Sequence, residues 1–139
     1  MIHSHTVQYY ETDKMGVTHH SNYIRWMEEA RVALLDEMGF GYDRLESMGI
    51  ISPVMSVDCR FKAPSTFADA IDVHAGIESF NGVVLRMCYR MVNRGGTLVC
   101  EGHSEHCFLN DKGHFIRLKR DFPDFYGALM ARVEGAPQA

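Results

Sequence analysis

The residues best suited to chemistry lie in one polar stretch, residues 10–23, directly before a long apolar segment. Asp13, Gly16 and His20 stand close together in it. A carboxylate can attack a carbonyl carbon or activate water to do so. The free N–H groups at a helix N-terminus can stabilise the carbonyl oxygen as it becomes negative. The stretch could therefore support attack on the carbonyl group of an acyl substrate. Taken on these residues alone, the simpler interpretation is favoured, in which Asp13 caps a turn and the histidines are solvated.

The element that must position these groups is a helix from Asn22 to about Met38. Its apolar side chains recur at three- and four-residue steps. Ser21 or Asn22 can cap its start, and Gly39 can end it. A helix that is apolar over so much of its circumference is expected to be buried.

Strands are expected on both sides of this helix. A first strand, Thr6–Tyr10, leads into a loop, Glu11–Ser21. After the helix and a short second one at Tyr42–Met48, the apolar period changes to two. The later strands expected are Val54–Lys62, Ala70–Glu78, Val83–Val92 and Thr97–Phe108, with hairpin turns at Asn81-Gly82 and Gly95-Gly96. After the last of these strands, the sequence predicts a turn at Asn110–Gly113, an edge strand near Phe115–Leu118, a helix at Asp121–Val133 and a frayed tail at Gly135–Ala139.

This order predicts an α+β fold, in which a curved antiparallel meander of four or five strands wraps around one long helix. With 139 residues, the chain suits a single domain. Its net charge of −4 argues against a general nucleic-acid binder. No window approaches the roughly 20 apolar residues that cross a bilayer. The four cysteines form no C-x-x-C pair and are expected to be reduced, which indicates a cytoplasmic protein.

Several motifs resemble the 4-hydroxybenzoyl-CoA thioesterase family, and most closely its YbgC-like acyl-CoA thioesterase branch. The specific ones come early: residues 9–13, Gly16-Val17, His20, Asn22-Tyr23, and Glu28 with Ala30-Arg31. Weaker ones follow at Ser52-Pro53-Val54, residues 61–64, Asn81-Gly82 and residues 111–113. The resemblance implies that residues 1–139 form one hot-dog thioesterase domain, with a long helix held in a curved antiparallel sheet.

The resemblance also implies site residues. Asp13 would be the catalytic carboxylate, and the backbone N–H of His20 would polarise the thioester. The acyl pocket would include Ser52, Pro53 and Val54. The remaining substrate-binding positions would be Gly16, Val17, Tyr23, Lys62, Asn81 and Gly82, with Lys62 as the single best candidate for the CoA phosphates. Family members form dimers that join their sheets edge to edge, or tetramers, with active sites between subunits. No cofactor is implied beyond the coenzyme A of the substrate.

The sequence departs from the family at two places. The segment Phe80–Val83 lacks the basic residue that often contacts the CoA phosphates, and His19 replaces a tyrosine. An aromatic hydroxybenzoyl substrate is therefore not favoured. The sequence leaves open the acyl length and head group, CoA against acyl-carrier protein, and a nucleophilic against a general-base Asp13.

Two other functions are weighed against hydrolysis: a hydroxyacyl-thioester dehydratase, and an acyl-CoA-binding or scaffolding protein with a vestigial carboxylate. Glu28 and Arg31 are expected to form a structural ion pair. A zinc site built from His103 and His106 with His19 and His20 is not expected, because positions three apart on a strand face opposite sides.

Overall fold

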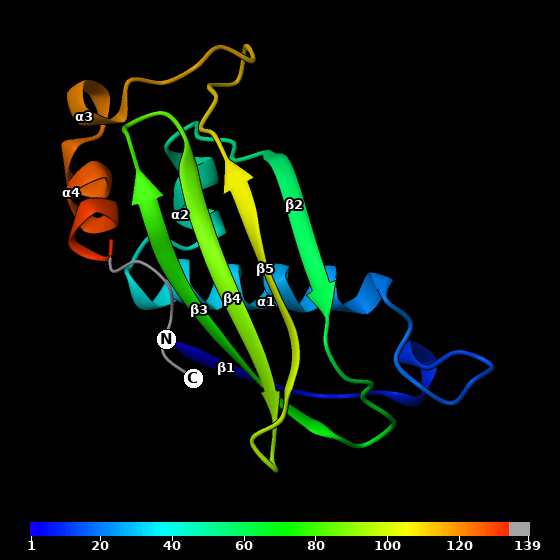
Figure 1. The fold of residues 1–139 in the computed structure, drawn as a ribbon. Coiled ribbons are helices and arrows are strands. Elements are labelled where there is room, and N and C mark those ends of the chain that lie inside the picture. The colour runs from blue at the N-terminus through cyan, green and yellow to red at the C-terminus, as the bar shows by residue number, and fades with distance from the viewer. Residues whose placement is uncertain (134–139) are drawn as a thin grey trace.

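The computed structural model describes residues 1–133 and contains one five-stranded antiparallel sheet curved around the helix α1 (Ser21–Glu37), as Figure 1 shows. The strands are β1 (Ile2–Thr6), β2 (Val54–Phe61), β3 (Ala70–Phe80), β4 (Leu85–Asn93) and β5 (Leu98–His106). Their order across the sheet is β1-β3-β4-β5-β2. The predicted α+β class with a long helix inside a curved sheet is confirmed. Within the described residues, no helix has both the length and the apolar character needed to span a bilayer.

The expected meander holds only for β3, β4 and β5, which follow one another through the two predicted hairpins. β2 pairs with β5 and not with its sequence neighbour β3. The reason is that β1 already occupies the free edge of β3, with Thr6 opposite Ala70. Val7 extends this pairing through backbone hydrogen bonds to Ala68 and Asp69. Within the described residues 1–133, no strand pairs with the outer edge of β2.

The core lies between α1 and the concave face of the sheet. Trp26 and Ala30 are fully buried on α1, as are Val73 and Met91 on the central strands. Gly102 of β5 is required here, because a Cβ at that position would overlap the Asp58 carbonyl oxygen of β2 and the methyl group of Met27. The apolar stripe of the predicted helix is thus the face that the sheet covers.

The first strand was predicted too late in the chain. It spans Ile2–Thr6, and Tyr9–Glu11 form a single 3-10 turn (η1). The inward side chains of β1 are His3 and His5, which lie 3.0 Å from Glu29 Oε1 on α1. Since that inner face is polar, an apolar alternation could not reveal it.

The C-terminal prediction also needs correction. The expected edge strand Phe115–Leu118 is reduced to one bridge between Leu109 and Phe115. The single helix predicted at Asp121–Val133 is two, α3 (Leu118–Asp121) and α4 (Pro123–Ala131). Pro123 disfavours helical geometry at Phe122, which has φ −139° and ψ 66°, so α4 starts anew. The short helix α2 (Tyr42–Ser47) was predicted, and the predicted tail Gly135–Ala139 lies outside the described residues.

Candidate active site

The polar loop before α1 is a short structure closed by its own backbone. A bridge between Thr12 and Thr18 joins its two ends. Inside it, the Asp13 N–H donates to the Val17 carbonyl and the Gly16 N–H donates to the Asp13 carbonyl, each over 2.9 Å. Gly16 has φ +79°, a left-handed conformation that favours glycine. The Met15 N–H donates to Asp13 Oδ1 over 2.9 Å, so the carboxylate is held in place while remaining partly accessible.

The helix N-terminus next to this loop is capped differently from the prediction. His20, and not Ser21 or Asn22, is the N-cap, and its own side chain makes no capping hydrogen bond. The Ser21 N–H has the His19 Nδ1 as acceptor, and the Asn22 and Tyr23 N–H groups have backbone carbonyls. Among the described residues, the His20 N–H finds no acceptor. It is therefore available to an oxygen from outside the chain.

Asp13 and His20 border one open hollow of about 330 Å³ at this end of α1. Val17, Tyr23 and Lys62 also line it, so five of the predicted site residues come together here. Gly16 lies in the same loop and shapes it without lining the hollow. The remaining lining residues are Met15, Thr18, Phe61, Ala63 and Pro64. A carboxylate, a free amide and a cation around one space can carry out attack on a carbonyl group.

A buried hydroxyl cluster supports the floor of the hollow. The Tyr23 hydroxyl lies 2.9 Å from Ser65 Oγ, which lies 2.6 Å from Thr18 Oγ1. Burial raises the pKa of Tyr23 above its ordinary value of 10.0, so the phenol keeps its proton at neutral pH. Tyr23 therefore positions the first turn of α1 and is not a base.

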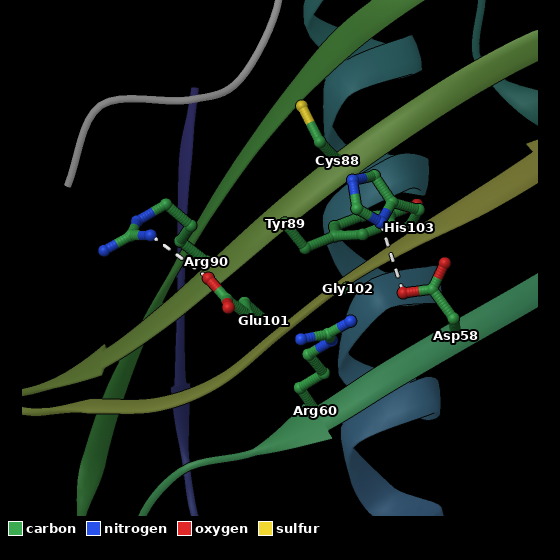
Figure 2. Close-up of a pocket in the computed structure, with 8 residues that line it drawn as sticks. All are labelled: Asp58, Arg60, Cys88, Tyr89, Arg90, Glu101, Gly102 and His103. Carbon is green, nitrogen blue, oxygen red and sulfur yellow. Dashed lines mark hydrogen bonds and ion pairs between the residues drawn. The ribbon is translucent and has the colours of Figure 1, made fainter.

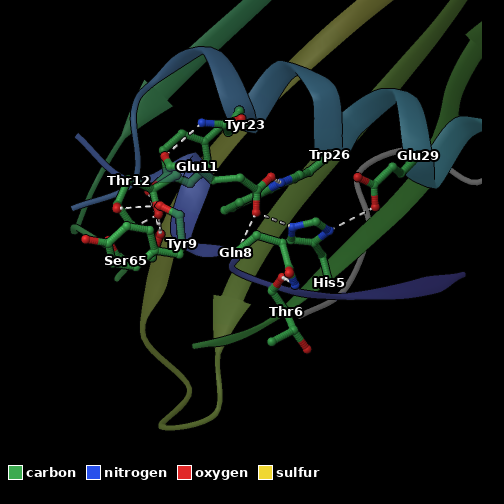
Figure 3. Close-up of polar contacts among 12 residues, drawn as sticks. His5, Thr6, Gln8, Tyr9, Glu11, Thr12, Tyr23, Trp26, Glu29 and Ser65 are labelled. Carbon is green, nitrogen blue, oxygen red and sulfur yellow. Dashed lines mark hydrogen bonds and ion pairs between the residues drawn. The ribbon is translucent and has the colours of Figure 1, made fainter. Parts of the chain in front are cut away.

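Glu11 is a buried carboxylate beside this site that the sequence analysis did not name as a site residue. Its carboxylate is 4% exposed and binds the Trp26 indole N–H, the His5 imidazole and the Gln8 N–H, each at 2.8 Å (Figure 3). Burial alone would raise the pKa of Glu11, but these hydrogen bonds together hold it below 4.5. The Glu11 carbonyl also accepts from the Asn22 side chain and the His19 N–H. Glu11 thus joins β1, the catalytic loop and α1.

The other predicted binding residues do not reach this hollow in a single chain. Val54 lines a separate cavity under α1, and neither Ser52 nor Pro53 borders the hollow. Asn81 and Gly82 lie in the β3–β4 hairpin beside α4, far along the sheet from the Asp13 loop (Figure 1). Their roles stay predictions that depend on a second copy of the chain.

A second hollow, of about 250 Å³, lies on the sheet face opposite α1 (Figure 2). Its charges are largely paired with each other: Arg90 Nη1 lies 3.2 Å from Glu101, and His103 Nδ1 lies 3.2 Å from Asp58. None of the predicted catalytic residues borders it. This surface is a network of cross-strand ion pairs rather than a reaction site.

Two further expectations can be followed in the structure. Arg31 Nη2 lies 3.9 Å from Glu28 Oε1, so the predicted ion pair is confirmed at long range. His103 lines the outer hollow and His106 an inner cavity, which confirms that they face opposite sides of the sheet. In the described part of the chain, no three His, Cys, Asp or Glu side chains are grouped to hold a metal ion.

Comparison with known proteins places this geometry in a family. The model of the thioesterase-like superfamily matches residues 7–132. YneP of Bacillus subtilis, named provisionally as an acyl-CoA thioesterase, is 37% identical over 124 residues, which cover 88% of this chain and 89% of YneP. The acyl-CoA thioester hydrolase YbgC of Escherichia coli is 30% identical over 68% of this chain and 71% of its own.

A solved structure agrees. The DHNA-CoA thioesterase of Staphylococcus aureus superposes with a TM-score of 0.89 at 34% identity, covering 94% of this chain and 88% of that one. The family match spans the Asp13 loop, α1 and the strands β2 to β5. The chain belongs to the thioesterase-like superfamily and is a thioester hydrolase with the hot-dog fold.

Proposed function

We propose that the protein hydrolyses the thioester bond of an acyl-CoA to a free acid and coenzyme A. One observation carries the proposal: Asp13 and His20 border the same hollow, and the His20 N–H has no acceptor among the described residues. The names of the relatives, an acyl-CoA thioester hydrolase and CoA thioesterases, support the same substrate class.

In the proposed reaction, the thioester carbonyl oxygen accepts a hydrogen bond from the His20 N–H. As the carbonyl carbon becomes tetrahedral, its oxygen becomes negative, and the donor and the helix N-terminus stabilise it. Asp13 either attacks the carbonyl carbon or removes a proton from the water that does so. The C–S bond then breaks, and coenzyme A leaves as its thiolate. If water is the nucleophile, this step yields the free acid directly. If Asp13 is the nucleophile, it leaves a mixed anhydride on Asp13, which water cleaves to give the free acid and restore the carboxylate. In this proposal the Asp13 side chain and the backbone N–H groups at the start of α1 carry out the reaction without a metal ion or a further cofactor.

Lys62 is proposed to contact the phosphates of coenzyme A. Its side chain is 43% exposed at the rim of the hollow, and its ammonium group lies 3.7 Å from Glu101 Oε1. At such exposure the ion pair contributes little stability, so the cation remains free to meet a phosphate.

We also propose that the working unit is a dimer, or a tetramer of such dimers. β2 is one of the two edge strands of the sheet, and it exposes Val54 (55%), Met55 (52%) and Phe61 (54%). An open apolar edge strand pairs readily with another strand. Two-fold pairing of β2 would set the Phe61 end of one copy, beside its Asp13 hollow, against the Val54 end of the other.

The direct test is to incubate the protein with a panel of acyl-CoA thioesters, with and without EDTA. Hydrolysis is measured by the appearance of the free thiol of coenzyme A. We expect turnover of at least one acyl-CoA, and EDTA should not change the rate of that turnover. Binding without turnover across the panel would instead favour the acyl-CoA-binding alternative. Loss of turnover with EDTA would refute the metal-free mechanism.

A further inference from the structure

The cavity under α1 that Val54 lines has a volume of about 120 Å³. It lies between α1 and the β2–β5 side of the sheet, on the face opposite the hollow of Figure 2. Val54 and Val57 of β2 form its apolar wall. Its polar wall consists of Arg31 on α1 with Tyr89, Ser104 and His106 on the sheet. The space is partly open, since Val54 is 55% exposed, but polar atoms that are themselves buried at its wall still require hydrogen-bond partners.

Arg31 is the principal cation of this cavity. Its side chain is 5% exposed, and its Nη1 has no hydrogen-bond partner among the described residues. The closest carboxylate, Glu28, is 3.9 Å from Nη2 and 66% exposed, so it compensates the buried charge only in part. A buried guanidinium with an unused donor favours an anionic oxygen as its ligand.

His106 supplies a second unused polar atom, because its buried Nδ1 also has no partner among the residues described. Its Nε2 lies 2.7 Å from Ser104 Oγ, which lies 2.7 Å from the Tyr89 hydroxyl. Burial, with the nearby Arg31, lowers the pKa of His106 to about 3, and burial raises that of Tyr89 to about 12. Both groups are therefore neutral at pH 7.

The direction of this hydrogen-bond chain decides what Nδ1 offers. If Tyr89 donates to Ser104 and Ser104 donates to His106 Nε2, each hydroxyl proton has an oxygen or nitrogen acceptor. The reverse direction would leave the Tyr89 proton only the Met87 sulfur, a weak acceptor 3.7 Å away. The first direction places the imidazole proton on Nδ1. Arg31 and His106 then present two donors to the cavity.

The cavity and the active-site hollow are bordered by the same two elements, α1 and β2. On α1, His20 and Tyr23 border the hollow, and the helix residues that border the cavity are Ile24, Arg25, Met27, Glu28 and Arg31. On β2, Phe61 borders the hollow, and Val57 and Val54 border the cavity. The two spaces therefore follow one another between α1 and β2. Arg31 stands roughly 16 Å beyond His20 along the helix, and its guanidinium lies 5.4 Å from the centre of the Tyr42 ring.

We propose that this cavity is a specificity site for a carboxylate at the far end of the acyl group, which makes ω-carboxyacyl-CoA thioesters the preferred substrates. The proposal rests on the proposed function and names its substrate class. Arg31 and His106 bind the carboxylate oxygens, while the apolar wall of β2 packs against the chain between the two ends. A simple fatty acyl group would leave both buried donors unpaired and is selected against.

The test compares kcat/KM for matched pairs of equal length: adipoyl with hexanoyl, suberoyl with octanoyl, and sebacoyl with decanoyl-CoA. The carboxylated member of at least one pair should be preferred by about a hundredfold. Arg31→Met should abolish that preference in two ways: kcat/KM should fall for the carboxylated member and rise for the fatty acyl partner, which no longer leaves a buried cation unpaired. Arg25→Met is the matched control, because Arg25 borders the same cavity but is exposed, and it should keep the preference.

A second measurement uses the unmodified protein, in case Arg31→Met does not fold. Free suberate should compete with substrate at much lower concentration than octanoate. Equal kcat/KM within every pair, or a preference only for 4-hydroxybenzoyl over benzoyl-CoA, would overturn the proposal while leaving thioester hydrolysis intact. Dissociation of the dimer by Arg31→Met with no change in substrate preference would also overturn it, because Arg31 would then serve the subunit contact. If no acyl-CoA is cleaved at all, the proposed function itself fails.

Discussion

The Trp26 indole N–H donates a 2.8 Å hydrogen bond to Glu11 Oε2, which ties the buried face of α1 to the segment that enters the catalytic loop. The same carboxylate binds His5 of β1. One buried side chain thus sets the relative position of a strand, a loop and a helix. Through these contacts it fixes the place of Asp13 and His20 without touching the hollow itself.

Replacing this carboxylate should weaken the whole junction. Glu11→Gln is expected to lower the free energy of unfolding by about 1–3 kcal/mol, because charge-assisted hydrogen bonds to a buried group are lost. Trp26 is the one tryptophan of the sequence, so its fluorescence reports the change directly. Glu46→Gln, at an exposed site on α2, is the control and should leave unfolding unchanged.

The Glu11 contribution should also depend on pH with a definite sign. The folded-state pKa lies below 4.5, so the ionised carboxylate stabilises the fold above that pH, and this stabilisation is lost as the pH falls through the folded value. The stability difference between the unmodified protein and Glu11→Gln should therefore shrink below pH 4.5. A difference that grows on acidification would contradict the assignment.

Asp13→Asn tests the catalytic carboxylate. The amide oxygen can still accept the Met15 N–H, so the loop should keep its shape. Turnover should nevertheless fall by about two orders of magnitude or more, as is typical when a general base is lost. Asp111→Asn, an exposed carboxylate in the turn before α3, serves as control. Near-normal turnover in folded Asp13→Asn would exclude Asp13 as nucleophile or base.

His20 allows its backbone and side chain to be tested separately. His20→Ala keeps the N–H and should retain most activity. His20→Pro removes the N–H, and the native φ of −57° already matches a proline ring. Because that N–H has no acceptor in the described structure, the fold should tolerate the change, whereas kcat should fall by about 100- to 1,000-fold. The opposite ranking would assign the role to the imidazole.

The subunit contact can be tested on the edge strand. Light scattering should show a dimer or tetramer at micromolar concentration. Val57→Lys, in the middle of β2, should shift the protein toward monomer, because two-fold pairing would place two like charges near each other. Ile2→Lys is the control on the opposite sheet edge, where Ile2 is 58% exposed. An active monomer of the unmodified protein would refute the proposed assembly.

The sequence predicted the central elements because their signals are local. The three- and four-residue apolar step identified α1, and the hairpin glycines identified the β3–β4 and β4–β5 connections. β1 escaped because its inward face is made of histidines that bind Glu29, a contact between distant segments. The β2–β5 pairing was also unpredictable, since it depends on β1 having taken the edge of β3.

The same distinction between local signals and contacts of distant segments decides which parts of the site were predicted. The loop and the helix start are adjacent in sequence, so Asp13 and His20 could be placed together in advance. Glu11 was missed because nothing local shows that a carboxylate beside an apolar helix will be buried against an indole. Arg31 and His106 come from elements 75 residues apart in the chain, and only the packed fold shows that they share a cavity.

The closed hydrogen bonding of residues 12–18 has a kinetic consequence. Its backbone is ordered in the free protein, with the Thr12–Thr18 bridge and the Asp13–Val17 bond already formed. Substrate therefore has no lid to recruit at this loop, and no slow closing motion should precede bond cleavage. Raising solvent viscosity with sucrose should leave the single-turnover rate of thioester cleavage unchanged, even if it slows the departure of coenzyme A.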